Sequence, residues 1–170
     1  MMLDMYEYGV SIDGFPDYEV TNYGRIFNIK TNREMILSPT AEGDSDLSVG
    51  LYRNHRQYRL SVKVLVAKTF VDGYSEIFNT PIQLDGDKTN LRSDNMVWRP
   101  RWFAWRYTHQ FKEIPDWYHY GPLIELRSQT SYNDYLEAAM VNGILCEDIR
   151  TSVYAGSRVF PTGQIFGYDD

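Results

Sequence analysis

The residues that could perform acid–base or metal chemistry are few in this sequence, and they are widely spaced. His55 lies in the tip of an expected hairpin, and His109 and His119 lie in or near an expected linker. None of these histidines has the spacing of a pair of metal ligands, so we interpret all three as surface or packing residues. Asp85 and Asp87 flank a glycine, and this arrangement is typical of a turn in which an aspartate caps the backbone.

The cysteine content and the length of the chain limit the kinds of fold and site that it can form. The single cysteine, Cys146, excludes an internal disulfide and a cysteine-ligated zinc site. A chain of 170 residues with 43% hydrophobic and 24% charged composition can form one core, or one domain with a small appendage. No apolar run approaches the length of a membrane span, and the acidic N-terminus does not resemble a signal peptide. We therefore expect a cytoplasmic location and no membrane partner.

The net charge of −6 argues against a simple nucleic-acid binder, because neutralising phosphates requires a basic surface. The charge is unevenly distributed: residues 1–24 carry −5, residues 25–106 carry +4, and residues 107–170 carry −5. The candidate DNA contacts in the middle segment are Arg53, Arg56, Arg59, Lys63, Lys68, Lys88, Arg92, Arg99 and Arg101. A solvated charged face is an equally good interpretation of these residues.

Tryptophans and arginines alternate between residues 98 and 107. Such a stretch can stack on nucleic-acid bases. We favour a helix that lies across the core with its arginine stems packed, because long basic side chains often cover apolar surface in this way.

Hydrophobic periodicity predicts an α+β fold with a β-rich beginning. The expected strands pair as two hairpins, the first turning at Lys30–Arg33 and the second at Arg53–Arg56. The expected strand segments are Arg25–Ile29, Glu34–Leu37, Asp44–Val49 (a strand or a loop), Leu51–Tyr52 and Gln57–Leu60. A helix with one apolar face follows over Ser61–Phe70, with Ser61 at its N-cap.

Shorter elements are expected in the second half of the chain. They are a strand at Pro81–Leu84, a short helix from Ser93, a strand at Leu123–Leu126, helices at Tyr132–Asn142 and Cys146–Thr151, and a closing strand at Val159–Phe166. Gly143 is expected to end the first of the two C-terminal helices.

Three strings together resemble a known family. Residues 12–26, IDGFPDYEVTNYGRI, are similar to the NUMOD4 module that accompanies HNH homing endonucleases, many of them from phages. Residues 61–70, SVKVLVAKTF, resemble a helix of the same proteins, with Lys63 standing where that helix usually has a histidine. Residues 84–90, LDGDKTN, followed by Asp94-Asn95-Met96 and Trp98, resemble the HNH core. The resemblance covers about residues 11–100.

The resemblance implies a site at which a histidine activates water while neighbouring side chains hold one divalent metal ion on the scissile phosphate. Here the histidine position is Gln83, which cannot take a proton near neutral pH, and its metal-ligand neighbour is Ile82, which has no donor atom. Asn90 and Asn95 are retained, but a single neutral carboxamide is a poor anchor for Mg²⁺. We therefore expect no intact catalytic site and no cofactor, with Mg²⁺ relevant only to residual nuclease activity and Asn95 its one weak ligand candidate.

The C-terminal residues from Ser131 to Ser152 weakly resemble the helix-turn-helix (NUMOD1-like) modules of such nucleases, although a helical pair packed only for stability is at least as good an interpretation. The expected organisation is a NUMOD4-like module at 1–50, a degenerate HNH-like ββα core at 51–107, a linker at 108–122 and a helical module with flanking strands at 123–170.

Two functions remain open on the sequence. The first is an inactive, phage-encoded HNH-endonuclease relative that binds DNA through its basic middle segment. The second is an HNH fold reused to bind protein, as part of a phage particle or as a ligand of a host factor, which would place it in the host cytoplasm or the virion. An active metal-dependent endonuclease is the least favoured interpretation, because the general base is missing.

Overall fold

The chain has a mixed α+β structure that divides into two compact units, and the predicted fold class is confirmed. The structure, a computed structural model, describes residues 6–43 and 45–170. Unit 1 comprises residues 1–83 and 87–101, and unit 2 comprises residues 84–86 and 102–170. Each unit buries its own apolar core.

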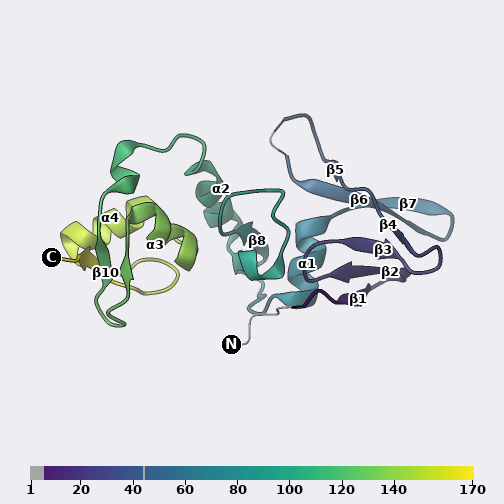
Figure 1. Cartoon of the computed structure of the whole chain (residues 1–170), viewed down its shortest axis with the longest axis horizontal. Helices are drawn as coiled ribbons and strands as arrows, with labels where there is room; N and C mark the ends of the chain where they lie inside the picture. Colours follow the sequence, from purple (N-terminus) through teal and green to yellow (C-terminus); the bar gives the residue numbers. More distant parts are fainter. Residues whose placement is uncertain (1–5, 44) are drawn as a thin grey trace. The chain divides into compact units, whose positions relative to one another are not determined.

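Two antiparallel sheets build most of unit 1 (Figure 1). The four-stranded sheet has the order β1 (Gly9–Ile12), β2 (Phe15–Thr21), β3 (Ile26–Asn28) and β4 (Arg33–Glu34). The three-stranded sheet has the order β5 (Ser38–Pro39), β6 (Leu47–Arg53) and β7 (Arg56–Ser61). Both predicted hairpins are present, although β4 ends at Glu34 and does not reach Leu37. Asp44, in the segment expected as strand or loop, lies outside the described residues.

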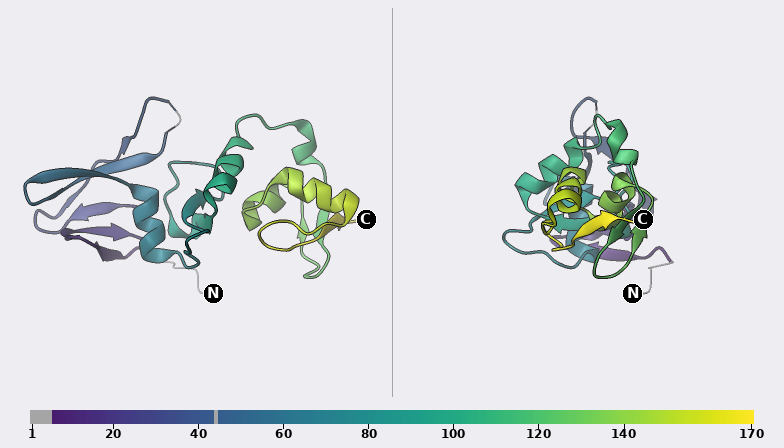
Figure 2. Two further views of the ribbon diagram at one scale, coloured as in Figure 1. Left: turned by 180° about the vertical axis from the view of Figure 1, so that it is seen from behind. Right: turned by 90° about the vertical axis from the view of Figure 1, so that its left-hand side faces the viewer.

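The β6–β7 hairpin is tightly closed and extends away from the helix that follows it (Figure 2). Its strands pair in continuous register up to Arg53 opposite Arg56. The two connecting residues, Asn54 and His55, have φ angles of 51° and 61°. Two positive φ values define a type I′ turn, whose twist matches that of paired strands. Val49 and Leu51 of β6 are buried, so the alternate residues of this strand face away from the core.

Helix α1 (Val62–Phe70) confirms the helix predicted from periodicity, and it contacts both the four-stranded and the three-stranded sheet. Val62 and Val66 are completely buried in the core, as the i, i+4 spacing requires. The prediction for Ser61 is only half right. It occupies the N-cap position, but its hydroxyl makes no capping hydrogen bond and is buried without a partner among the described residues.

Strands β8 (Thr80–Gln83) and β9 (Met96–Arg99) form a two-stranded sheet, and the 3₁₀ helix η1 (Ser93–Asn95) lies in the loop between them. The short helix predicted at Ser93 is therefore present. The N-terminal sheet supports this loop, because the backbone N–H of Ser93 donates to the carbonyl of Asn22 at 2.8 Å.

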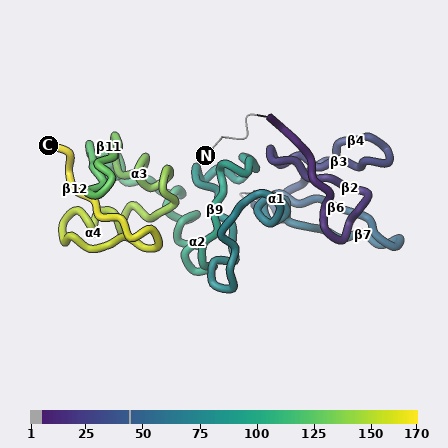
Figure 3. The backbone as a smooth tube through the Cα atoms, turned by 90° about the horizontal axis from the view of Figure 1, so that it is seen from below, coloured from purple at the N-terminus to yellow at the C-terminus, as the bar shows by residue number. Residues whose placement is uncertain are grey.

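Unit 2 packs two helices against a small sheet (Figure 3). It contains most of α2 (Arg101–His109), the 3₁₀ helix η2 (Asp116–His119), and helices α3 (Tyr135–Asn142) and α4 (Cys146–Ala155). Its sheet has the order β11 (Ser131–Tyr132), β10 (Leu123–Glu125) and β12 (Phe166–Tyr168). The stretch of tryptophans and arginines at residues 98–107 thus begins in strand β9 and continues in helix α2. This helix buries Phe103, Ala104 and Tyr107.

Three C-terminal boundaries differ from the sequence predictions. The first helix begins at Tyr135 rather than Tyr132, because Asp134 caps it and Tyr132 pairs with β10. The second continues four residues beyond Thr151 and ends at Ala155, just before Gly156, which has a φ of 67°. The predicted closing strand is wrong in position: Val159 forms only an isolated bridge with Gln164, and β12 starts at Phe166.

Within residues 6–43 and 45–170, no helix has the length and apolar character that a membrane crossing requires. The predicted module boundaries at residues 50, 107 and 122 were placed by sequence resemblance, whereas the two units are defined by their internal contacts. The module boundaries therefore stay a prediction.

We expect Asp134→Ala to destabilise unit 2 by about 1 kcal/mol. The Asp134 carboxylate accepts from the backbone N–H of Glu137 at 2.7 Å, and the Glu137 side chain accepts in turn from the backbone N–H of Asn133. Hydrogen exchange of the α3 amides measures this loss without depending on unit 1. Asp134→Asn, which keeps the acceptor, should recover most of it, and unchanged exchange in the alanine variant would contradict the capping role.

Candidate functional site

Gln83 and Ile82, the positions of the implied histidine and its neighbour, end strand β8. Ile82 pairs with Val97 and Gln83 with Met96 on β9. The exposed fractions are 2% for Ile82 and 7% for Gln83, so neither side chain is open to bulk water. Because successive residues of a strand point to opposite faces, the two side chains diverge.

The side chains of Gln83 and Asn95 meet at one backbone oxygen. Gln83 Nε2 donates to the carbonyl of Asn90 at 3.0 Å, and Asn95 Nδ2 donates to the same carbonyl at 3.1 Å. The structure therefore brings together three of the positions singled out in the sequence. Both carboxamides present N–H donors to this oxygen, whereas a metal ion requires lone pairs.

The acids nearest in sequence do not replace the missing groups. Asp87 Oδ1 accepts from the hydroxyl and the backbone N–H of Thr89, at 2.6 and 2.9 Å, and these bonds lower the pKa of the Asp87 carboxyl. A carboxylate with a lowered pKa is a weaker general base. Asp85 is exposed in the turn before Gly86, consistent with a turn residue.

The resemblance implies one divalent metal ion at this site, and the residues present do not fit it. Mg²⁺ prefers carboxylate oxygens, but the side chains that converge here are two carboxamides, while Ile82 supplies none. Among the described residues, no group of three or more His, Cys, Asp or Glu side chains could hold a metal ion.

Lys63, at another position that departs from the family, has an ion-pair partner. Its Nζ lies 3.1 Å from Asp46 Oδ2, and its side chain is 20% exposed. The neighbouring carboxylate neutralises most of the attraction that this ammonium would exert on a phosphate. Lys68, one turn further along α1, is exposed and remains a candidate.

The three hairpin arginines have different surroundings. Arg53 is a structural residue: its guanidinium donates to the carbonyl of Gly14 at 3.0 Å and lies 4.7 and 4.8 Å from the ring centroids of Phe15 and Tyr58. Arg59 donates to the hydroxyl of Ser48 at 3.0 Å, which orients its exposed guanidinium. Arg56 is exposed beside the turn, and its side chain has no ion pair or hydrogen bond with any described residue.

The other predicted contacts are spread over the β8–β9 region. Arg92 pairs with Asp94 at 3.1 Å and lies 4.0 Å from the ring centroid of Tyr23; the Asp94 hydrogen bond is the main cause that raises the pKa of Arg92. Arg99 donates to the carbonyl of Trp98 at 2.9 Å. Lys88 is half-buried and Arg101 is exposed.

A groove of about 360 Å³ on the outer face of the hairpin escaped the sequence analysis. Tyr52, Gln57 and Arg59 lie in its wall, and Arg33 and the exposed Ile36 face them from the segment around β4. Alternation along β6 and β7 could have identified the first three, because Val49, Leu51, Tyr58 and Leu60 occupy the opposite, core-facing positions.

Comparisons with known proteins agree with this architecture. Residues 10–43 match the NUMOD4 motif. The chain is structurally similar to the HNH homing endonuclease I-HmuI, in a structure described as showing its DNA binding and cleavage. The TM-score is 0.51 at 22% sequence identity, and the match covers 95% of this chain and 98% of that chain. No curated protein matches the sequence. The chain thus carries a NUMOD4 motif and has the fold of an HNH homing endonuclease.

We expect Gln83→Glu to lower the free energy of unfolding by about 1–3 kcal/mol at neutral pH. An ionised carboxylate cannot donate to the Asn90 carbonyl and would place two acceptors against each other. Gln83→Met, which removes the donor without adding an acceptor, should cost about 1 kcal/mol. Urea unfolding of both variants measures the difference, and equal stabilities would contradict the donor role of Gln83.

Proposed function

We propose that this protein is a catalytically inactive relative of HNH homing endonucleases that binds DNA through the outer face of its β6–β7 hairpin. The observation that carries the proposal is the side chain at the end of β8: Gln83 occupies the position of the general base, and its nitrogen is bound to the Asn90 carbonyl.

Loss of hydrolysis follows from the chemistry of the groups present. A carboxamide does not accept a proton near neutral pH, so Gln83 cannot activate water. Neither Gln83 nor Asn95 supplies a carboxylate for the divalent ion. A general base and a metal ion make separate contributions to phosphodiester hydrolysis, and these two side chains are suited to neither role.

DNA binding is supported by the shape and the side chains of the hairpin. A two-stranded β-ribbon fits the major groove of B-DNA. The face turned away from the core carries Tyr52, Gln57 and Arg59, and Arg56 lies beside the turn. Carboxamides and guanidinium groups are the side chains that read adenine and guanine through pairs of hydrogen bonds.

The protein-binding alternative is favoured by the charge of unit 2. This unit contains 10 acidic and 5 basic residues, which gives a net charge of −5, whereas unit 1 has a net charge of −1. A phosphate backbone would be repelled by such a unit, but a basic protein would be attracted. DNA contact by unit 1 and protein contact by unit 2 are compatible in one chain.

We expect Arg56→Ala to weaken binding to duplex DNA similarly for different sequences and to reduce the slope of log K against log salt by about 1. The reason is the loss of one exposed cation that no described acid neutralises. Fluorescence anisotropy over a salt series measures both quantities. Arg127→Ala removes the same charge from unit 2 and should leave the slope unchanged; no binding by the unaltered protein at low salt would overturn the proposal.

We expect no nicking of supercoiled plasmid by the purified protein in Mg²⁺ or Mn²⁺ above the level seen with chelator. The groups at positions 82 and 83 can neither bind the ion nor take the proton. Agarose-gel separation of supercoiled and nicked plasmid measures the outcome. Metal-dependent nicking that Asn95→Ala abolishes would show that this site still hydrolyses DNA.

A further inference from the structure

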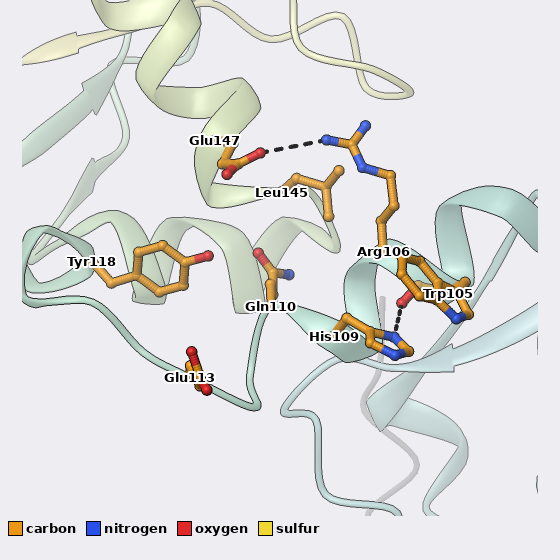
Figure 4. Close-up of a pocket in the computed structure, with 8 residues that line it drawn as sticks. All are labelled: Trp105, Arg106, His109, Gln110, Glu113, Tyr118, Leu145 and Glu147. Carbon is orange, nitrogen blue, oxygen red and sulfur yellow. Dashed lines mark hydrogen bonds and ion pairs between the residues drawn. The ribbon is translucent and has the colours of Figure 1, made fainter.

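A cavity of about 260 Å³ lies entirely within unit 2, between the end of α2 and the start of α4 (Figure 4). None of its lining residues belongs to the β8–β9 site or to the hairpin. Its walls come from segments that are distant in the sequence, including Trp105 and His109 of α2, Tyr118 of η2 and Glu147 of α4.

Tyr118, a largely buried residue, presents its hydroxyl to this cavity. The residue is 6% exposed, and Figure 4 shows its hydroxyl pointing into the space beside Gln110. No group in residues 6–43 or 45–170 makes a hydrogen bond with it. Burial raises the pKa of Tyr118 to about 12, so the phenol keeps its proton. A buried phenol normally has a polar partner, and a ligand in the cavity would supply one.

Backbone contacts fix the hydrogen-bonding roles of His109, the last residue of α2, and of Gln110, which follows it. His109 Nδ1 lies 2.7 Å from the carbonyl of Trp105, and a carbonyl can only accept, so Nδ1 carries the hydrogen. The neutral ring therefore has its free lone pair on Nε2. The Gln110 carboxamide is occupied, because its oxygen accepts from the backbone N–H of Cys146 at 3.0 Å.

Two carboxylates, Glu113 and Glu147, and one cation, Arg106, also line the cavity. Glu113 is exposed and has no ion pair or hydrogen bond in the described chain. Glu147 lies 3.6 Å from Arg106, but their side chains are 71% and 44% exposed, so solvent screens this pair. The lining thus sets two carboxylates against the single cation Arg106, and it adds the imidazole lone pair and the phenol. The excess of negative charge favours a cationic ligand with several N–H donors.

Trp105 adds a flat aromatic surface to the cavity. It is 63% exposed, and its ring stacks on His109 with centroids 3.8 Å apart and planes inclined by 24°. The stack holds the indole in place, which lowers the entropic cost of using it for binding. Indole is the ring that binds cations most strongly, and a planar guanidinium can stack on it while its edge donates to carboxylates.

We propose that this cavity binds the arginine side chain of a partner protein. A guanidinium combines the positive charge, the flat face and the five N–H donors that the lining requires, whereas a lysine offers a compact charge with three. The net charge of −5 on unit 2 favours a basic polypeptide and opposes a nucleic acid. The inference rests on the second proposed function, and it is independent of DNA binding by the hairpin.

The test uses the full-length ¹⁵N-labelled protein and a blocked pentapeptide with a central arginine between glycines. We expect saturable NMR shifts at the Trp105 indole N–H and at the amides around Glu113 and Glu147. The same peptide with citrulline, which is nearly isosteric but uncharged, should bind about tenfold more weakly or not detectably. Trp105→Ala and Glu113→Gln should each lower the affinity for the arginine peptide by about three- to tenfold.

Matched variants separate binding from folding. Trp102→Ala removes an exposed tryptophan from the same helix outside the cavity, and Asp116→Asn removes an exposed charge outside it; neither should change peptide affinity. Tyr118→Phe removes only the unpartnered hydroxyl, so it should lower the affinity for the arginine peptide without lowering the melting temperature of the protein. Arg56→Ala should leave peptide binding intact, which distinguishes failure of this proposal from failure of DNA binding. Equal affinity for the citrulline peptide, an unaffected Tyr118→Phe variant, or displacement of the peptide by a single-stranded oligonucleotide would overturn it.

Discussion

The carbonyl oxygen of Asn90 accepts hydrogen bonds from the side chains of Gln83 and Asn95, and this pair of bonds joins the end of β8, the following loop and η1. A carbonyl has two lone pairs, so both acceptor positions are filled. The arrangement holds the loop without any group that titrates near neutral pH. It also turns the N–H edges of both carboxamides toward the point where they converge. A divalent ion placed there would be repelled by those edges, so the contact that stabilises the loop also opposes metal binding.

Local chemistry explains which parts of the fold could be predicted from the sequence. The β6–β7 hairpin follows from alternating side chains and a two-residue turn, and α1 follows from the helical spacing of Val62, Leu65, Val66 and Phe70. Both depend on residues close together in the chain. The helix that was expected at Tyr132 begins at Tyr135, because a strand pairing competes with helix formation over the first residues. β12 was misplaced for the same reason: its register is set by β10, about forty residues earlier.

The candidate site was predictable in its residue types but not in its contacts. Spacing identified Gln83 and Asn95, but not the backbone oxygen that both side chains bind. Arg53 and Lys63 appear in the sequence as free cations. In the structure a carbonyl and two rings hold Arg53, and Asp46 neutralises Lys63. Charge alone therefore overestimates the phosphate-binding surface of unit 1. The cavity of unit 2 corresponds to no sequence motif, because its walls come from α2, η2, α4 and the segments between them.

The persistence of an HNH-like scaffold around Gln83 has a structural cause that does not involve hydrolysis. Gly24, within the NUMOD4 motif, has a φ of 84°, and a side chain there would collide with Leu91, whose carbonyl oxygen would lie 2.7 Å from a Cβ. Beside it, the carbonyl of Asn22 accepts from Ser93 at 2.8 Å. The motif and the β8–β9 loop therefore fit against each other through positions that tolerate little change. Gln83 takes no part in that contact, so the residue type at position 83 can change while these packing residues stay in place. The constraint on the fold is therefore separate from any constraint on chemistry at the end of β8.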